Sequence, residues 1–445
     1  MTDNTKAGDG AQARETTGAR EATGAPVTTG APETAGALET TGAPETTGAP
    51  VTAGPPAPVA YTPRERASLL LRRLVRSRVA QAVTAAGLVG VLLGAGTVAW
   101  RTDTLPLLSP DPCWDTFDSD LVTRVFGDRE TVAETQRLRT DPNSRVASYG
   151  QCRITGYEDG EKGRAARQLT VQVHTLSRHG ARDSRVWPGE FLASDMVPLG
   201  EGLPGMVSPS RAWLALPESC TGEPDILSTR TVVDLAMGDV TDGDIAPRRA
   251  PKDRAALSDA VVAVTNGVLR ELGCSGTYTA PAPEKLGDLV GWQDTDPDAF
   301  CGIKGLRLPA AYRDALNRVR AGGGSGPART CEATRNSPSG DLRLTTVVEP
   351  GVARVFAEDA THDGTSLRGP KGGTPGWGSV NVMRGVYMAQ CQSGDVAFVV
   401  EEVKSVISKG EDKGKEPNLV RALLPAYVEA EAERIGCGPI RLKLP

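Results

Sequence analysis

The eight cysteines of this chain constrain its fold most strongly, because they form two sets of four with closely matching spacing. They are Cys113, Cys152, Cys220, Cys274, Cys301, Cys331, Cys391 and Cys437. Successive gaps are 39, 68 and 54 residues in the first set and 30, 60 and 46 in the second. The cysteines are even in number and widely spaced, and no two of them form a CxxC pair. This pattern predicts disulfides rather than a zinc or redox site. We therefore expect two tandem copies of one domain.

The repeated spacing favours disulfides within each copy, with the first cysteine joined to the second and the third to the fourth. Four cysteines allow three pairings, so the spacing alone does not settle the connectivity. The expected disulfides are Cys113–Cys152, Cys220–Cys274, Cys301–Cys331 and Cys391–Cys437.

Both copies show the same order of apolar patterns. Each ends in a stretch of helical periodicity, residues 257–272 and 419–435, followed directly by Gly-Cys. Glycine after the last helical residue is the usual left-handed cap. Strand-like runs precede these helices, at residues 169–176, 211–216 and 226–237 in the first copy and 342–349, 380–388 and 396–403 in the second.

This order of patterns predicts an α+β fold, in which each copy is an antiparallel sheet packed by helices. The first copy covers residues 101–280 and the second covers residues 281–445, with the boundary near the proline-rich residues 278–283.

The opening of the first copy resembles small exported domains of actinobacterial lipoproteins and membrane-tethered proteins. The resemblance rests on Asp111-Pro-Cys113, on Leu121-Val122 in a short helix-like segment, and on Cys152-Arg-Ile before a strand. It implies export of the domain. It implies no catalytic residue, because those families have no agreed activity.

Residues 1–60 are a degenerate hexapeptide array with units such as ETTGAP and EATGAP, and the first aromatic residue is Tyr61. A solenoid would need a large aliphatic residue in each turn, and these units offer threonine, alanine and glycine. We expect a disordered tail, because such a segment cannot bury enough apolar surface to offset its chain entropy.

Residues 79–100 form an uncharged, mostly apolar stretch of 22 residues. As a helix it would extend about 33 Å, against a hydrocarbon core of about 30 Å. Six arginines lie in the basic, amphipathic residues 61–78, whereas Arg101, Asp103 and Asp111 follow the stretch. The positive-inside rule then predicts one transmembrane helix, with the N-terminus in the cytoplasm and the cysteines outside.

Two further interpretations concern the same stretch. A cleaved signal peptide is the alternative to an anchor, although its leader would be unusually long. Small residues recur every four positions and would allow two such helices to approach closely, so a homodimer is a candidate. These residues are Ala82, Ala86, Gly90 and Gly94.

The sequence offers no recognisable catalytic or cofactor-binding motif, because GxSxG, SxxK, HExxH and Walker A patterns are all absent. The only histidines are His174, His179 and His362. His174 and His179 are five residues apart, whereas one strand face needs a spacing of two, so they do not form a natural ligand pair. We expect them to be core or surface histidines and name no catalytic, cofactor-binding or metal-binding residue.

Two groups of three aspartates resemble the start of a calcium-binding loop, but neither has all the residues that such a loop needs. Asp294, Asp296 and Asp298 are followed by Ala299 and Gly305, where a calcium loop needs glycine and glutamate. A second incomplete triplet comprises Asp239, Asp242 and Asp244. Five tryptophans are expected as core anchors, with a groove lining as the alternative, namely Trp114, Trp187, Trp213, Trp292 and Trp377.

The formal net charge of −5 excludes a basic nucleic-acid binder. We expect a single-pass, membrane-anchored envelope protein whose disulfide-stabilised ectodomain binds a ligand or protein, or acts as a sensor, without catalysis. The alternative is an extracytoplasmic enzyme of the hydrolase type. A Ser, Asp or Glu that meets a histidine in a cleft would favour the enzyme.

Overall fold

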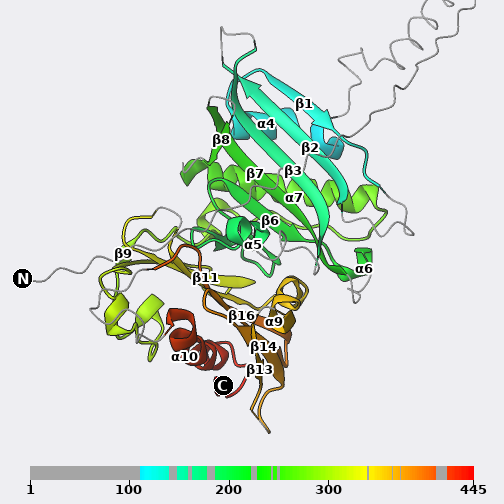
Figure 1. The fold of residues 1–445 in the computed structure, drawn as a ribbon. Helices are drawn as coiled ribbons and strands as arrows, with labels where there is room; N and C mark the ends of the chain where they lie inside the picture. Colours follow the sequence, from blue (N-terminus) through cyan, green and yellow to red (C-terminus); the bar gives the residue numbers. More distant parts are fainter. Residues whose placement is uncertain are drawn as a thin grey trace, which may run out of the picture. The chain divides into compact units, whose positions relative to one another are not determined.

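The computed structural model describes residues 111–139, 148–158, 163–177, 186–221, 228–241, 244–247, 251–337, 340–362, 364–370, 372–406 and 418–445. These residues form two antiparallel sheets of eight strands each, with helices packed on them (Figure 1). The α+β class and the two antiparallel sheets expected from the sequence are confirmed.

The first sheet has the strand order β1-β2-β3-β7-β6-β5-β4, and β8 pairs with β7 beside this path. Its elements are α3 (Pro112–Asp115), α4 (Ser119–Phe126), β1 (Thr131–Thr135), β2 (Ser148–Tyr157), β3 (Ala165–Ser177), α5 (Val186–Phe191), β4 (Val197–Pro198), β5 (Gly205–Val207), β6 (Arg211–Ala215), α6 (Glu218–Thr221), β7 (Ser228–Thr241), β8 (Asp244–Pro247) and α7 (Pro251–Glu271).

The second sheet has the strand order β13-β14-β15-β16-β12-β11-β10-β9. Its elements are η1 (Pro283–Lys285), β9 (Gln293–Asp294), η2 (Phe300–Gly302), η3 (Ala310–Tyr312), β10 (Arg318–Gly322), β11 (Ala328–Thr334), β12 (Leu342–Val347), α8 (Pro350–Ala353), η4 (Arg354–Phe356), α9 (Asp359–His362), β13 (Thr365–Arg368), β14 (Gly376–Val380), β15 (Arg384–Cys391), β16 (Gly394–Glu402) and α10 (Leu419–Arg434).

The two sheets share one topology. If β1, β2 and β3 are matched with β10, β11 and β12, and β4 to β7 with β13 to β16, the strand orders coincide, and only β8 and β9 are additions. The opening cysteines also correspond in conformation, because Cys113 and Cys301 both have a positive φ, of 55° and 62°.

The four disulfides join the cysteines in the expected pairs. Cys113 bonds to Cys152 and Cys220 to Cys274, and in the second half Cys301 bonds to Cys331 and Cys391 to Cys437. Each half therefore has one disulfide between its opening segment and a central strand, β2 or β11. The other disulfide joins the segment after the last helix to α6 in the first half and to the end of β15 in the second. No cysteine is free.

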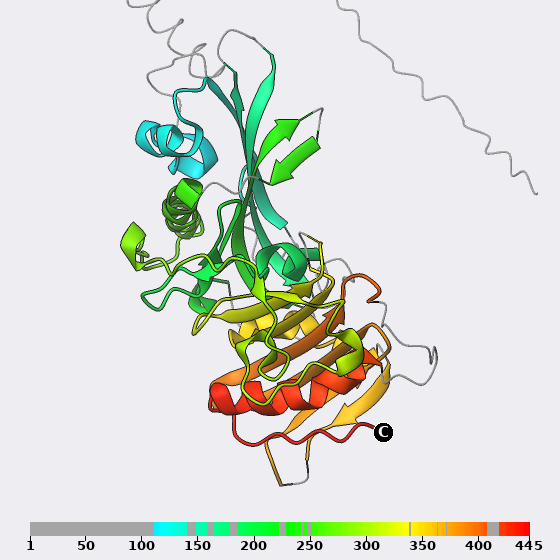
Figure 2. The ribbon, with the colours of Figure 1, turned by 90° about the vertical axis from the view of Figure 1, so that its left-hand side faces the viewer.

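The long helices α7 and α10 each cover the outer face of one sheet, and Figure 2 shows α10 lying across the strands of the second sheet. One apolar core lies under α7 and includes Leu214, Val233 and Val261. The other lies under α10 and includes Phe398 and Leu424. The predicted helices 257–272 and 419–435 are thus confirmed. Their glycine caps are confirmed too, because the φ values of Gly273 and Gly436 are +70° and +72°.

The inner faces of the two sheets contribute to one shared core. It contains Trp213 and Val232 from the first half together with Val347, Val399 and Met388 from the second. Side chains alternate between faces along a strand, so these residues point away from α7 and α10.

The two halves approach so closely that one contact requires glycine. A Cβ atom on Gly322 in β10 would lie 2.3 Å from the carbonyl oxygen of Ser194, closer than any side chain allows.

The fold class expected from the sequence is corrected in one respect. It included a transmembrane helix, whereas none of the helices in the described ranges is both long and apolar enough to span a bilayer. Residues 79–100, the tail at 1–60, the basic segment at 61–78 and the small-residue ridge all lie outside those ranges. The fold class of the described chain is α+β with two antiparallel sheets and four disulfides.

A second correction concerns the strand-like run at residues 380–388, which is two strands joined by a turn. β14 ends at Val380 and β15 begins at Arg384. The Oδ1 atom of Asn381 accepts hydrogen bonds from the backbone N–H groups of Met383 and Arg384, both at 2.8 Å. An Asn side chain that bonds to the following backbone favours a turn over a continuous strand.

We predict that the native protein has no thiol that reacts with maleimide, and that eight react after reduction in denaturant. Replacing both Cys301 and Cys331 with serine should lower the free energy of unfolding by about 3–4 kcal/mol, because it opens a loop of 30 residues. Denaturant titration measures this loss. Reactive thiols in the native protein, or an unchanged stability of the double variant, would contradict the prediction.

Candidate functional site

Five charged residues of alternating sign form a row across the inner face of the second sheet. In the strand register, Arg320 faces Glu332, Glu332 faces Arg343, Arg343 faces Glu401, and Glu401 faces Arg384. The row therefore crosses β10, β11, β12, β16 and β15. Cross-strand neighbours of opposite charge stabilise a sheet, whereas like charges would repel. We call these five residues the charge row.

The ion pairs of the charge row are short and mostly buried. Glu332, which is 2% exposed, lies 2.9 Å from the Nη2 atom of Arg320 and 2.8 Å from that of Arg343. The Nη1 atom of Arg384 lies 3.0 Å from the Oε1 atom of Glu401, and its Nη2 atom lies 2.8 Å from Asp359. Three arginines thus face three carboxylates, which offsets the cost of removing these charges from water.

Two segments of the first half of the chain, around Ser194 and in α5, contact the charge row. The hydroxyl of Ser194 accepts a hydrogen bond from the Nε atom of Arg320 at 2.7 Å and donates one to Glu332 at 2.6 Å. Helix α5 packs over the middle of the row, where a Cβ atom on Gly189 would lie 3.3 Å from the Nη1 atom of Arg343. A larger residue at this position of α5 would displace the end of the Arg343 side chain.

A cavity of about 760 Å³ lies beside α5 and above one end of the charge row. We call it the α5 groove. Its lining residues come from α5, from the turn between β14 and β15, and from the ends of β12 and β16, and comprise Val186, Gly189, Glu190, Arg343, Asn381, Val382, Met383, Arg384, Glu401, Glu402 and Val403.

The α5 groove brings together most of the exposed large apolar side chains. Among the residues that the structure describes, six such side chains are exposed, and four of them line this groove. They are Val186, Val382, Met383 and Val403, with exposed fractions of 48%, 65%, 38% and 40%. An apolar cluster of this kind on a polar surface is typical of a binding site.

Glu402 is the one acidic residue of the α5 groove without a cationic partner in the described ranges. Glu190 lies 3.1 Å from the Nη2 atom of Arg211, and Glu401 pairs with Arg384. Burial raises the pKa of the Glu402 carboxyl above its usual value, although a hydrogen bond from the backbone of Val406 partly offsets this effect.

A second cavity, of about 410 Å³, lies on the other side of α5 and shares Val186 and Glu190 with the α5 groove. In it, the Nε2 atom of His174 lies 2.7 Å from the Oδ2 atom of Asp234. The indole N–H of Trp187 donates to the same oxygen at 3.0 Å. This geometry fixes the orientation of the imidazole ring.

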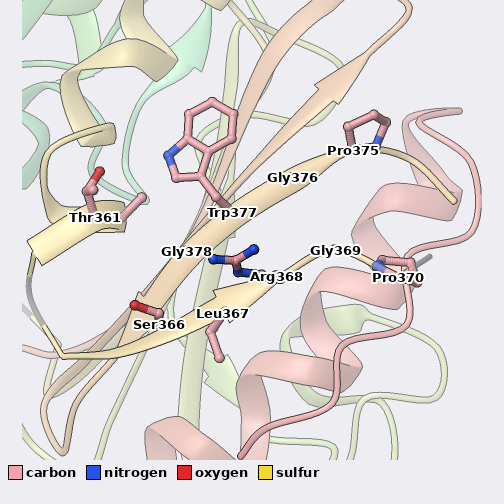
Figure 3. A pocket seen from close by; sticks show the side chains of 11 residues that line it. Thr361, Ser366, Leu367, Arg368, Gly369, Pro370, Pro375, Gly376, Trp377 and Gly378 are labelled. Carbon is pink, nitrogen blue, oxygen red and sulfur yellow. The ribbon is translucent and has the colours of Figure 1, made fainter. Parts of the chain in front are cut away.

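A third cavity, of about 440 Å³, lies at the free edge of the second sheet and is shown in Figure 3. Its residues come from α9, β13, β14 and the segment that joins the two strands. Trp377 and Arg368 face one another across β13 and β14.

The structure tests several residues singled out in the sequence. His174 does meet an acidic side chain in a cavity, His362 is exposed in α9, and His179 lies outside the described ranges. Asp296 forms a turn, because its Oδ1 atom accepts from the backbone N–H of Asp298 at 3.0 Å. Within the described ranges, no three His, Cys, Asp or Glu side chains are grouped as a metal site.

The tryptophans divide between the two predicted roles. Trp114, Trp187 and Trp213 are core residues, as expected, and Trp187 also lines a cavity. Trp377 is partly buried and lines the third cavity, and the Trp292 ring lies 4.9 Å from the guanidinium carbon of Arg320. The analysis of the sequence missed the charge row. Its only local signal was a charged residue within an otherwise uncharged strand, such as Arg343 in β12.

Searches among protein families, curated proteins and solved structures found nothing similar to this chain. The compartment is indicated by the chain itself. Four disulfides and no free cysteine are typical of a domain outside the cytoplasm, where the environment is oxidising.

We predict that Glu402→Gln stabilises the folded protein at pH 7. Because the pKa of Glu402 is raised on folding, the wild type loses stability as the pH rises from about 4.3 through that raised value, and the loss persists above it. The advantage of the variant should therefore disappear below about pH 4. Denaturant titrations at both pH values measure it.

Glu429→Gln is the matched control, because Glu429 is exposed and lies 3.2 Å from the Nε atom of Arg441. Its loss should change the free energy of unfolding by less than about 1 kcal/mol. Equal stability of wild type and Glu402→Gln at pH 7 would show that burial of this carboxyl has no energetic effect.

Proposed function

We propose that this protein is a non-catalytic binding protein that works outside the cytoplasm and holds a polypeptide segment of a partner in the α5 groove. The observation that supports the proposal is the gathering of exposed apolar side chains around this groove. The segment would carry an apolar side chain next to a lysine or arginine.

The position of the apolar side chains favours a polypeptide over a small molecule. Val382 is 65% exposed and Val403 is 40% exposed, so both keep a large water-accessible area although they line the cavity. A small molecule inside the cavity would leave much of this surface exposed. A polypeptide that crosses the groove would cover it, and burial of apolar surface contributes about 25 cal/mol per Å².

The charges beneath the groove favour a cationic partner. Arg343 and Arg384 already pair with Glu332, Asp359 and Glu401. Glu402 remains as the carboxyl without a cationic partner among the described residues, and its burial raises its pKa. A lysine or arginine beside it would supply the missing counter-charge and restore the usual preference for the ionised form.

We predict that selection of displayed random peptides on the full-length protein enriches sequences with an apolar residue near a lysine or arginine. Val382→Asp should weaken the binding of such a synthetic peptide at least tenfold, because it removes an apolar contact and adds a desolvation cost. Glu402→Gln should weaken it less and reduce its dependence on salt. Fluorescence anisotropy measures both effects.

Val132→Asp is the matched control, because Val132 is 51% exposed in β1 and does not line the groove. It should bind the peptide like the wild type. Enrichment of acidic peptides, or equal binding by Val382→Asp and wild type, would refute the proposal.

A second candidate function is hydrolysis, which is favoured by the contact between His174 and Asp234 in the cavity of about 410 Å³. A histidine held by a buried carboxylate can act as a general base toward water, and such catalysis contributes about 10²–10⁴-fold in rate. If this function holds, His174→Gln should reduce the hydrolysis of p-nitrophenyl acetate at least a hundredfold. Equal rates for variant and wild type would exclude the role of His174.

A further inference from the structure

The cavity at the free edge of the second sheet has a composition unlike that of the α5 groove. β13 is the terminal strand of the sheet, so the cavity is bounded by only one further strand, β14, and by α9. Figure 3 shows Trp377 rising from β14, Arg368 on β13, Thr361 on α9, and two prolines at the other end. The cavity shares no lining residue with the α5 groove.

Trp377 differs from the core tryptophans in its hydrogen bonding. The indole N–H groups of Trp114, Trp187 and Trp213 donate to Gln136, Asp234 and Phe191 at 2.7–3.0 Å. No acceptor in the described part of the chain binds the indole N–H of Trp377, which is only partly buried. Partly packed against the core between the sheets, Trp377 offers the cavity both a flat apolar face and an available donor.

Arg368 is the single charged residue lining the cavity, and it is exposed. No carboxylate of the described residues lies within ion-pair distance of its guanidinium. Ser366 lies two residues before Arg368 in β13, so both side chains are on the same face of the sheet. Ser366 thus adds a hydroxyl to the cavity. The cavity thus combines hydrogen-bond donors, one positive charge and an aromatic face, with no acidic side chain in its lining.

We propose that this cavity binds an acidic saccharide, with one sugar ring on the Trp377 indole and the carboxylate of the sugar on Arg368. A guanidinium binds a carboxylate through charge-assisted hydrogen bonds, which are about twice as strong as neutral ones. The indole N–H and the Ser366 hydroxyl then bind the ring hydroxyls. The volume of about 440 Å³ falls within the usual range for small-molecule sites.

The short edge strand favours a saccharide over an added peptide strand. β13 has four residues and is followed by Gly369 and Pro370. Edge strands this short are a common protection against pairing with another chain. A saccharide needs no backbone register, and a chain of sugars can extend past the free edge of the sheet.

Calorimetric titration of the full-length protein with a trimer of α-1,4-linked galacturonic acid tests the proposal. We expect binding that Arg368→Gln weakens at least tenfold, which corresponds to the loss of one charge-assisted hydrogen bond. Trp377→Leu should abolish the binding. Trp377→Phe, which keeps a flat ring and loses the donor, should weaken it several-fold. Far-ultraviolet circular dichroism verifies that each variant is folded.

Three comparisons make the outcome decisive. The neutral trimer of galactose with the same linkage should bind at least tenfold more weakly, and Arg313→Gln, at another exposed arginine, should bind like the wild type. Benzoate tests whether any ring with a carboxylate suffices, and binding of benzoate with the same dependence on Arg368 and Trp377 would overturn the saccharide assignment. Undetectable binding of the acidic trimer at millimolar concentration, or full binding by Arg368→Gln, would overturn the proposal. None of these variants changes a residue that lines the α5 groove, so the results are independent of the function proposed for it.

Discussion

The burial of the two inner sheet faces against one another is the constraint on which the rest of the structure depends. Helices α7 and α10 cover the outer faces, so the apolar inner faces must find another cover. The two inner faces cover one another, and their side chains form a core that both halves share. The close contact of Gly322 with the backbone at Ser194 shows how little space separates the halves. Burial of this apolar surface supplies a large favourable term for joining the two copies into one unit.

The charge row lies on the inner face of the second sheet, at a place where polar side chains of the two halves meet. A charge removed from water is costly unless it meets an opposite charge. The register of five strands satisfies this condition by placing arginine and glutamate in alternation, and Ser194 contributes from the other half. The α5 groove opens beside α5. The arginines at its floor are already paired with carboxylates, and the apolar side chains at its rim are exposed to solvent. Glu402 is the exception, because its partly buried carboxyl has no cationic partner among the described residues.

Much of the scaffold could be predicted from the sequence because its signals are local or repeated. The repeated spacing favoured the disulfide pairs that the structure contains, and glycine after a periodic stretch marked the ends of α7 and α10. The turn at Asn381 was missed because the run around it is apolar enough to suggest a single strand. The cavities were not predictable, because Arg368 and Trp377 become neighbours only through the pairing of β13 with β14.

By itself, the sequence determined the duplicated α+β plan and the paired cysteines, which are typical of a compartment outside the cytoplasm. These follow from composition, periodicity and spacing, which act along the chain. Only the tertiary structure decided which faces of the sheets meet and which side chains share a site. The residues of the charge row and of the two cavities beside α5 come from distant parts of the chain, whereas the residues of the third cavity all lie between positions 360 and 378. Strand register and packing brought them together, and both are set by the burial of whole faces rather than by any local pattern.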